Sequence, residues 1–71
     1  MYKGEFCYTK LWKLLLDRNM LKKDLMQLTG INSSTIAKMG KGQPISMAVL
    51  ARICDALGCD IGDIVHYNTK E

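Results

Sequence analysis

The 71-residue chain lacks the residues from which disulfide frameworks and zinc sites are usually built. It has one histidine and three cysteines, and it contains no Cys-x-x-Cys pair. An odd number of cysteines does not make a disulfide framework, and a zinc site would lack its usual ligand spacing. We interpret Cys7, Cys54 and Cys59 as small buried or half-buried hydrophobic residues. Metal binding and redox chemistry are the alternatives, and we expect no metal ion or other cofactor.

Long apolar runs and catalytic signatures are also missing. No run approaches the roughly 20 residues of a transmembrane helix, and the N-terminus has no charged-then-apolar signal pattern. We therefore expect a cytoplasmic protein with no membrane partner. His66 has no nucleophile and orienting acid that the sequence would place beside it, and there is no glycine-rich phosphate loop or paired-carboxylate signature. We predict a protein that is not an enzyme, and no small-molecule ligand is evident.

The chain has enough apolar residues, 48%, to form a core, and its length suits one domain over residues 1–71. Its charge is unevenly distributed. Residues 1–41 hold eight Lys or Arg and three acids, a net charge of +5, whereas residues 42–71 hold two and four, a net charge of −2. A cationic half is what phosphate neutralisation requires. Solvated surface lysines would give the same pattern, so charge alone does not decide.

Residues 22–41, KKDLMQLTGINSSTIAKMGK, have the outline of two short helices joined by a tight turn. Gly30 lies between them, and glycine most easily adopts the left-handed conformation that ends a helix. In the second segment Ile36 and Met39 are three residues apart and share one helix face. Two helices joined by a three- or four-residue turn containing glycine are typical of a helix-turn-helix.

The apolar periodicity predicts an all-α fold, a compact five-helix bundle with possible short extended termini. In the helix of residues 47–57 Ser46 is a plausible N-terminal cap, Gly58 ends the helix, and Cys54 falls on the apolar face. The expected helices cover about residues 9–19, 22–29, 33–41, 47–57 and 61–64, with extended segments at about 5–8 and 65–67.

Two segments resemble the Cro and phage-repressor family of DNA-binding domains: LWKLL at residues 11–15 and SSTIAK at residues 33–38. The similarity continues through residues 50–57 and 60–65, so it covers most of the chain. The resemblance implies a five-helix domain whose third helix, about residues 33–41, enters the major groove of DNA. The chain departs from the family at Met26, where a small residue is frequent, and at Leu21, where a Ser or Thr cap is frequent.

Three residues of the third helix are predicted to read bases: Ser33, Ser34 and Lys38. Ser34 and Lys38 lie four apart, opposite the apolar face, and Ser33 begins the helix, where recognition helices meet base edges. Serine hydroxyls and the lysine ammonium can both bond base edges. An ordinary capped helix with a solvated lysine is the alternative. A second set is predicted to contact the DNA backbone: Lys22, Lys23, Asn32, Thr35, Lys41 and Gln43.

These features predict sequence-specific binding of double-stranded DNA by a transcriptional regulator, most simply a repressor. We expect a homodimer, because one recognition helix reads too few base pairs to be selective. The predicted interface is a surplus apolar stripe, Tyr8, Trp12 and Leu16, together with Phe6 and residues 65–67. Alternatively, the C-terminal tail covers Trp12 within one chain. A protein-interaction module with weak or no DNA binding is the competing function.

Overall fold

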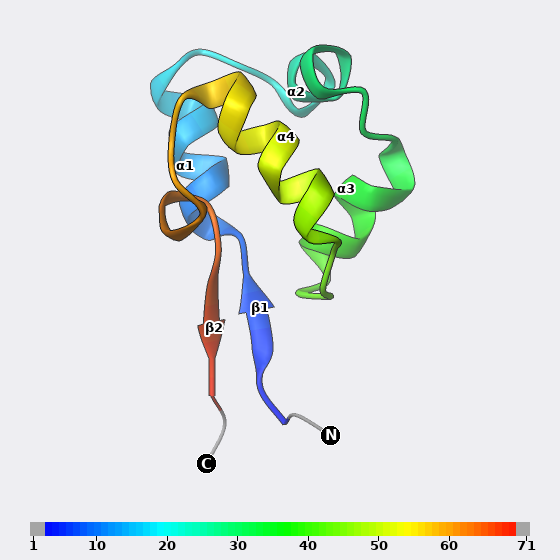
Figure 1. The fold of residues 1–71 in the computed structure, drawn as a ribbon, viewed down its shortest axis with the longest axis vertical. Helices are drawn as coiled ribbons and strands as arrows, with labels where there is room; N and C mark the ends of the chain where they lie inside the picture. Colours follow the sequence, from blue (N-terminus) through cyan, green and yellow to red (C-terminus); the bar gives the residue numbers. More distant parts are fainter. Residues whose placement is uncertain (1–2, 70–71) are drawn as a thin grey trace.

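The computed structural model describes residues 3–69, which form four α-helices, one turn of 3-10 helix and two short strands (Figure 1). In chain order the elements are β1 (Glu5–Cys7), α1 (Thr9–Asp17), α2 (Lys22–Thr29), α3 (Ser33–Gly40), α4 (Met47–Leu57), the 3-10 turn η1 (Ile61–Asp63) and β2 (His66–Asn68). None of the helices in this part of the chain is both long and apolar enough to cross a membrane.

The mostly helical fold and its extended ends agree with the sequence prediction, whereas the fifth helix does not. It is the single turn η1, which Asp60 and Asp63 cap reciprocally before the chain continues into β2. Helix α1 is also shorter than predicted and ends at Asp17, because Asn19 adopts a positive φ of 55° that no α-helix accommodates. The predicted bounds of α2 and α4 are confirmed, and α3 ends one residue early, at Gly40.

The two strands join the beginning and the end of the chain in an antiparallel pair. Phe6 lies opposite Tyr67, and their rings meet edge-to-face with centroids 5.2 Å apart. On the other side of β1 the Phe6 N–H donates to the Gly42 carbonyl at 3.2 Å. The pair of strands thus projects from one end of the helices (Figure 1), and β1 contacts the loop after α3.

The core lies between the helices, with α4 crossing between α1 and α3 and packing against α2 (Figure 1). Each helix contributes the apolar residues of one face, as the 3.6-residue period requires. The buried residues are Tyr8, Leu11, Leu15, Leu25, Ile31, Met39, Leu50, Ile53, Leu57 and Ile64. Cys54, predicted on the apolar face of α4, is half-buried and packs against this cluster.

The surplus apolar stripe of α1 has three different environments. Tyr8 is only 3% exposed, and its hydroxyl donates to the Gln43 carbonyl at 2.8 Å. Trp12 is half-buried, and the ammonium of Lys22 lies over its ring. Leu16 is 74% exposed. Tyr8 is therefore part of the core, contrary to its assignment to a subunit interface.

Candidate nucleic-acid interface

The helix-turn-helix is fixed by the turn between α2 and α3. Helix α2 ends at Gly30, which has a φ of 76° and donates its N–H to the Met26 carbonyl at 2.8 Å. Ile31 follows and is buried in the core. Because Leu25 of α2 and Met39 of α3 are also buried, both helices are anchored to the same core. The outer face of α3 is consequently held in one orientation.

The side chain of Asn32 caps the N-terminus of α3. Its Oδ1 accepts hydrogen bonds from the Thr35 N–H at 2.9 Å, the Ser34 hydroxyl at 2.9 Å and the Thr35 hydroxyl at 3.1 Å. Asn32 was predicted to contact the DNA backbone, and the structure shows that its side-chain oxygen stabilises the start of α3. Its NH₂ group still has two protons with which an amide can donate to a phosphate.

The three residues predicted to read bases, Ser33, Ser34 and Lys38, are all exposed. Ser34 and Lys38 lie on the face of α3 opposite the buried Met39. Because the Ser34 hydroxyl donates its proton to Asn32, the lone pairs of its oxygen are what it can offer a base. Lys38 offers only hydrogen-bond donors, so the two side chains together present both acceptors and donors.

Ala37 is exposed on this face as well, although sequence reasoning did not select it. It lies three residues after Ser34 and immediately before Lys38, so it belongs to the same surface. Its methyl group has the size and polarity to contact the methyl group of thymine. The three-residue spacing between Ser34 and Ala37 is the sequence signal that indicates this shared face.

Five of the six predicted backbone-contacting residues are exposed: Asn32, described above, and Lys22, Lys23, Lys41 and Gln43. Lys22 is the first residue of α2, where helix amides and the helix dipole favour an anion. Lys41 and Gln43 lie in the loop after α3, where glycines at 40 and 42 predict a flexible segment. That loop is held by hydrogen bonds instead, since the Gln43 N–H donates to the Lys38 carbonyl at 3.0 Å.

Thr35 and Leu21 differ from the simple picture of a phosphate-contacting surface. Thr35 is half-buried and its hydroxyl proton is donated to Asn32, so that proton is not directed at DNA. At Leu21 there is no side-chain cap for α2. The carboxylate of Asp24 accepts the Leu21 N–H at 2.8 Å, as its place in the first turn suggested.

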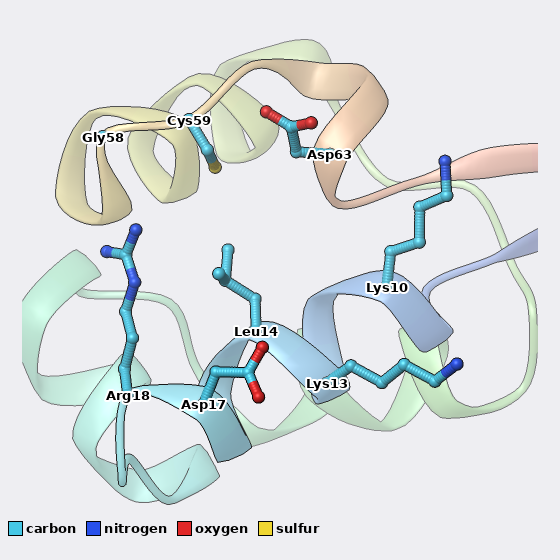
Figure 2. A pocket seen from close by; sticks show the side chains of 8 residues that line it. All are labelled: Lys10, Lys13, Leu14, Asp17, Arg18, Gly58, Cys59 and Asp63. Carbon is cyan, nitrogen blue, oxygen red and sulfur yellow. The ribbon is translucent and has the colours of Figure 1, made fainter.

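Chemistry other than nucleic-acid binding has little support on this surface. Among residues 3–69 no group of three or more His, Cys, Asp and Glu side chains is arranged to hold a metal ion. An open cavity of about 460 Å³ lies elsewhere, between α1 and the segment that follows α4 (Figure 2). It is lined by both cations and carboxylates and does not include the recognition helix.

Comparisons with known proteins agree with this geometry. Residues 10–70 match the model of the Cro/C1-type HTH DNA-binding domain. The chain is 37% identical over 60 residues to YozG of Bacillus subtilis (strain 168), named as an uncharacterized HTH-type transcriptional regulator, covering 82% of this chain and 71% of that protein. It is also similar to the crystal structure of the transcriptional regulator VanUg (form II), with a TM-score of 0.91 and 43% identity over 99% of this chain and 93% of that one.

The family match spans most of the chain and includes all four α-helices except the first residue of α1. The chain belongs to the Cro/C1-type helix-turn-helix family, and its function is DNA binding in the regulation of transcription, not catalysis.

Proposed function

We propose that this protein is a sequence-specific repressor that inserts α3 into the major groove of its operator. The observation that carries the proposal is the division of α3 into two faces. Met39 anchors one face in the core, while Ser34, Ala37 and Lys38 are exposed on the other. A helix held in this way presents a fixed set of donors, acceptors and a methyl group to base edges.

In the proposed complex the residues around α3 hold the DNA backbone. Lys22 and Lys23 begin α2, and Lys41 and Gln43 follow α3, so these residues stand before and after the helix-turn-helix along the chain. Such contacts give affinity and register but carry no sequence information. Asn32 contributes through its NH₂ group, and Thr35 acts mainly through the cap of α3.

The proposed repressor acts as a homodimer in the cytoplasm, with residues 1–71 as one DNA-binding domain. Two copies are needed because a single recognition helix reads too few base pairs to select one site in a genome. The surface available for a second copy is smaller than the sequence suggested, because Tyr8 is buried. What remains of the predicted interface is Trp12, Leu16, Phe6 and residues 65–67, and we propose to add Leu21, which is 60% exposed.

Selection of bound sequences from a random pool of duplex DNA tests this proposal. We expect enrichment of a motif with two related half-sites, and an affinity for that motif that falls steeply as salt is raised. The control is the pool before selection, titrated at the same salt concentrations. If no motif is enriched and binding stays weak at every salt concentration, the chain is a protein-interaction module on a helix-turn-helix scaffold. Promoter occupancy with reduced transcript levels separates repression from activation.

A further inference from the structure

The C-terminus of α4 brings two cysteines together. Gly58 adopts a left-handed conformation with φ 65°, and its N–H donates to the Cys54 carbonyl. The N–H of Cys59 donates to the same carbonyl at 3.1 Å. This hydrogen bond is typical of a Schellman motif. In that motif the side chain of the residue after the left-handed residue often packs against the side chain of the residue whose carbonyl accepts the bond. In this chain both of those side chains carry thiols.

The two thiols are close to the core but not sealed within it. Cys54 and Cys59 are half-buried and pack against the buried cluster. Cys59 also lines the 460 Å³ cavity, where its sulfur points toward Leu14 of α1 (Figure 2). Arg18 extends from the end of α1 toward Gly58 on the same side of the cavity (Figure 2). A small molecule can therefore reach the Cys59 sulfur from solvent.

A disulfide between these two cysteines requires that their side chains be neighbours. Cysteines joined by a disulfide have their Cα atoms about 4.4–6.8 Å apart. Cys59 donates its N–H to the Cys54 carbonyl, and, besides burial, a side-chain hydrogen bond with Cys59 is among the causes that raise the pKa of the Cys54 thiol, so the two thiols are neighbours. The third thiol, Cys7, is placed differently. It lies on β1, with its Sγ 3.2 Å from the Thr9 hydroxyl oxygen.

We propose that Cys54 and Cys59 are a redox-active thiol pair that a low-molecular-weight disulfide, of the class of glutathione disulfide, converts to an intrachain disulfide. This assignment does not depend on the proposed repressor function. In the first step the Cys59 thiolate attacks one sulfur of glutathione disulfide, forming a mixed disulfide and releasing one glutathione. In the second step Cys54 attacks the Cys59 sulfur and releases the second glutathione. The two cysteine thiols are oxidised, and the added disulfide is reduced to two glutathione thiols.

The surroundings of each thiol fit these two roles. Cys59 lines the cavity through which the reagent arrives, which suits the first attack. Burial, followed by the adjoining Cys59 thiol, raises the pKa of the Cys54 thiol. A raised pKa lowers the thiolate fraction of Cys54, and the Cys54 thiol lies beside the sulfur that it must attack in the second step. An intramolecular attack needs little thiolate, because the effective concentration of the neighbouring group is high.

Cys7 must be removed from the test because it is a third thiol on which glutathione can form a mixed disulfide. The hydrogen bond with Thr9 lowers the pKa of the Cys7 thiol, and a lower pKa increases the thiolate fraction. Cys7 has a hydroxyl neighbour rather than a thiol neighbour. It is therefore expected to keep a bound glutathione, unlike the pair. The Cys7→Ser chain is the appropriate background for every measurement.

The Cys7→Ser protein is equilibrated in buffers of varied glutathione to glutathione disulfide ratio, alkylated and digested with trypsin. Cleavage after Arg52 and Lys70 leaves both thiols in one peptide, residues 53–70. We expect the oxidised peptide to be lighter by two hydrogens than the unmodified dithiol peptide, with no alkyl group and no glutathione on its cysteines. In the folded protein the disulfide should form at a ratio about tenfold less oxidising than in the same chain unfolded in urea, because the Schellman motif holds the thiols together.

The Cys54→Ser change in this background removes the second attack, so Cys59 should accumulate as a stable glutathione adduct. Circular dichroism verifies that this variant is folded, and Cys54→Ala replaces it if it is not. Two results would overturn the proposal. One is a lasting glutathione adduct in the folded chain that has both Cys54 and Cys59. The other is a disulfide that forms at the same midpoint glutathione ratio in the folded and the urea-unfolded Cys7→Ser protein. This second result needs neither of the Cys54 variants.

Discussion

The ammonium nitrogen of Lys22 lies 4.5 Å from the centroid of the Trp12 ring. This cation–π contact joins the first residue of α2 to the middle of α1 and is worth about 0.5–1 kcal/mol at an exposed site. It also restricts a long side chain that would otherwise sample many rotamers. A cation held near its working position loses less entropy when it meets a phosphate. Trp12 is thus a positioning residue for a proposed DNA contact.

Lys22→Ala should weaken binding to operator and to random DNA to a similar extent and reduce the slope of log affinity against log salt by about one unit. Trp12→Leu should weaken both kinds of binding less and leave the slope unchanged, because the charge is still present. Anisotropy titrations with labelled duplexes over a range of salt concentrations measure both quantities. A lower slope for Trp12→Leu would contradict the assignment, since counterion release depends on the number of phosphates neutralised.

Lys38→Ala should lower affinity for the preferred site by about 1–3 kcal/mol, because it removes a donor to a base edge. Binding to random DNA should fall less, and a repeated selection should tolerate more bases at one or two operator positions. Lys22→Ala is the matched control, with the same loss of charge outside the recognition helix. If Lys38→Ala reduced operator and random binding equally, with base preferences unchanged, the exposed face of α3 would not be the reader.

Asn32→Ala should destabilise the protein by about 0.5–2 kcal/mol, the usual cost of losing an N-terminal cap. Its Oδ1 accepts three hydrogen bonds at the start of α3, so the change should also loosen Ser34 and Thr35. Asn32→Asp keeps an acceptor oxygen and should retain most of the stability measured by urea unfolding. It should nevertheless weaken DNA binding, because it places a negative charge near phosphates. Equal stability for wild type and Asn32→Ala would show that the cap is dispensable.

Local signals in the sequence were sufficient to predict the elements that matter most for the site. Helices α2 and α4 are bounded by glycines that adopt left-handed conformations, and Ser46 accepts the Val49 N–H as a cap should. The bounds of α1 were predicted less well, because Asn19 at positive φ has no sequence signal as strong as glycine. Where a helix boundary depends on a glycine or a capping side chain within a few residues, prediction and structure agree.

Interactions between distant segments could not be read in the same way. The register of β1 and β2 pairs residues about 60 positions apart, and nothing in either short segment specifies the partner. The hydroxyl of the buried Tyr8 is satisfied by the carbonyl of Gln43, which only the fold brings within reach. The contact of Lys22 with Trp12 is of the same kind. These side chains were assigned by helical spacing, which fixes a face but not what lies against it.

The proposed homodimer gives the last prediction. A mainly apolar groove of about 360 Å³ is lined by Trp12, Leu15, Leu16, Met20, Leu21 and Lys22, and Leu16 is 74% exposed. A second copy of this chain is the partner that we propose for it.

Leu16→Asp should weaken self-association by at least about tenfold, because it places a charge where apolar surface would be buried. Met47→Asp is the matched control, since Met47 is 67% exposed and is not among the residues that line this groove. Sedimentation at micromolar concentration, with and without operator, measures the effect. A wild-type chain that remains monomeric in both conditions would remove the dimer from the proposed mechanism, and equal effects of the two substitutions would place its interface elsewhere.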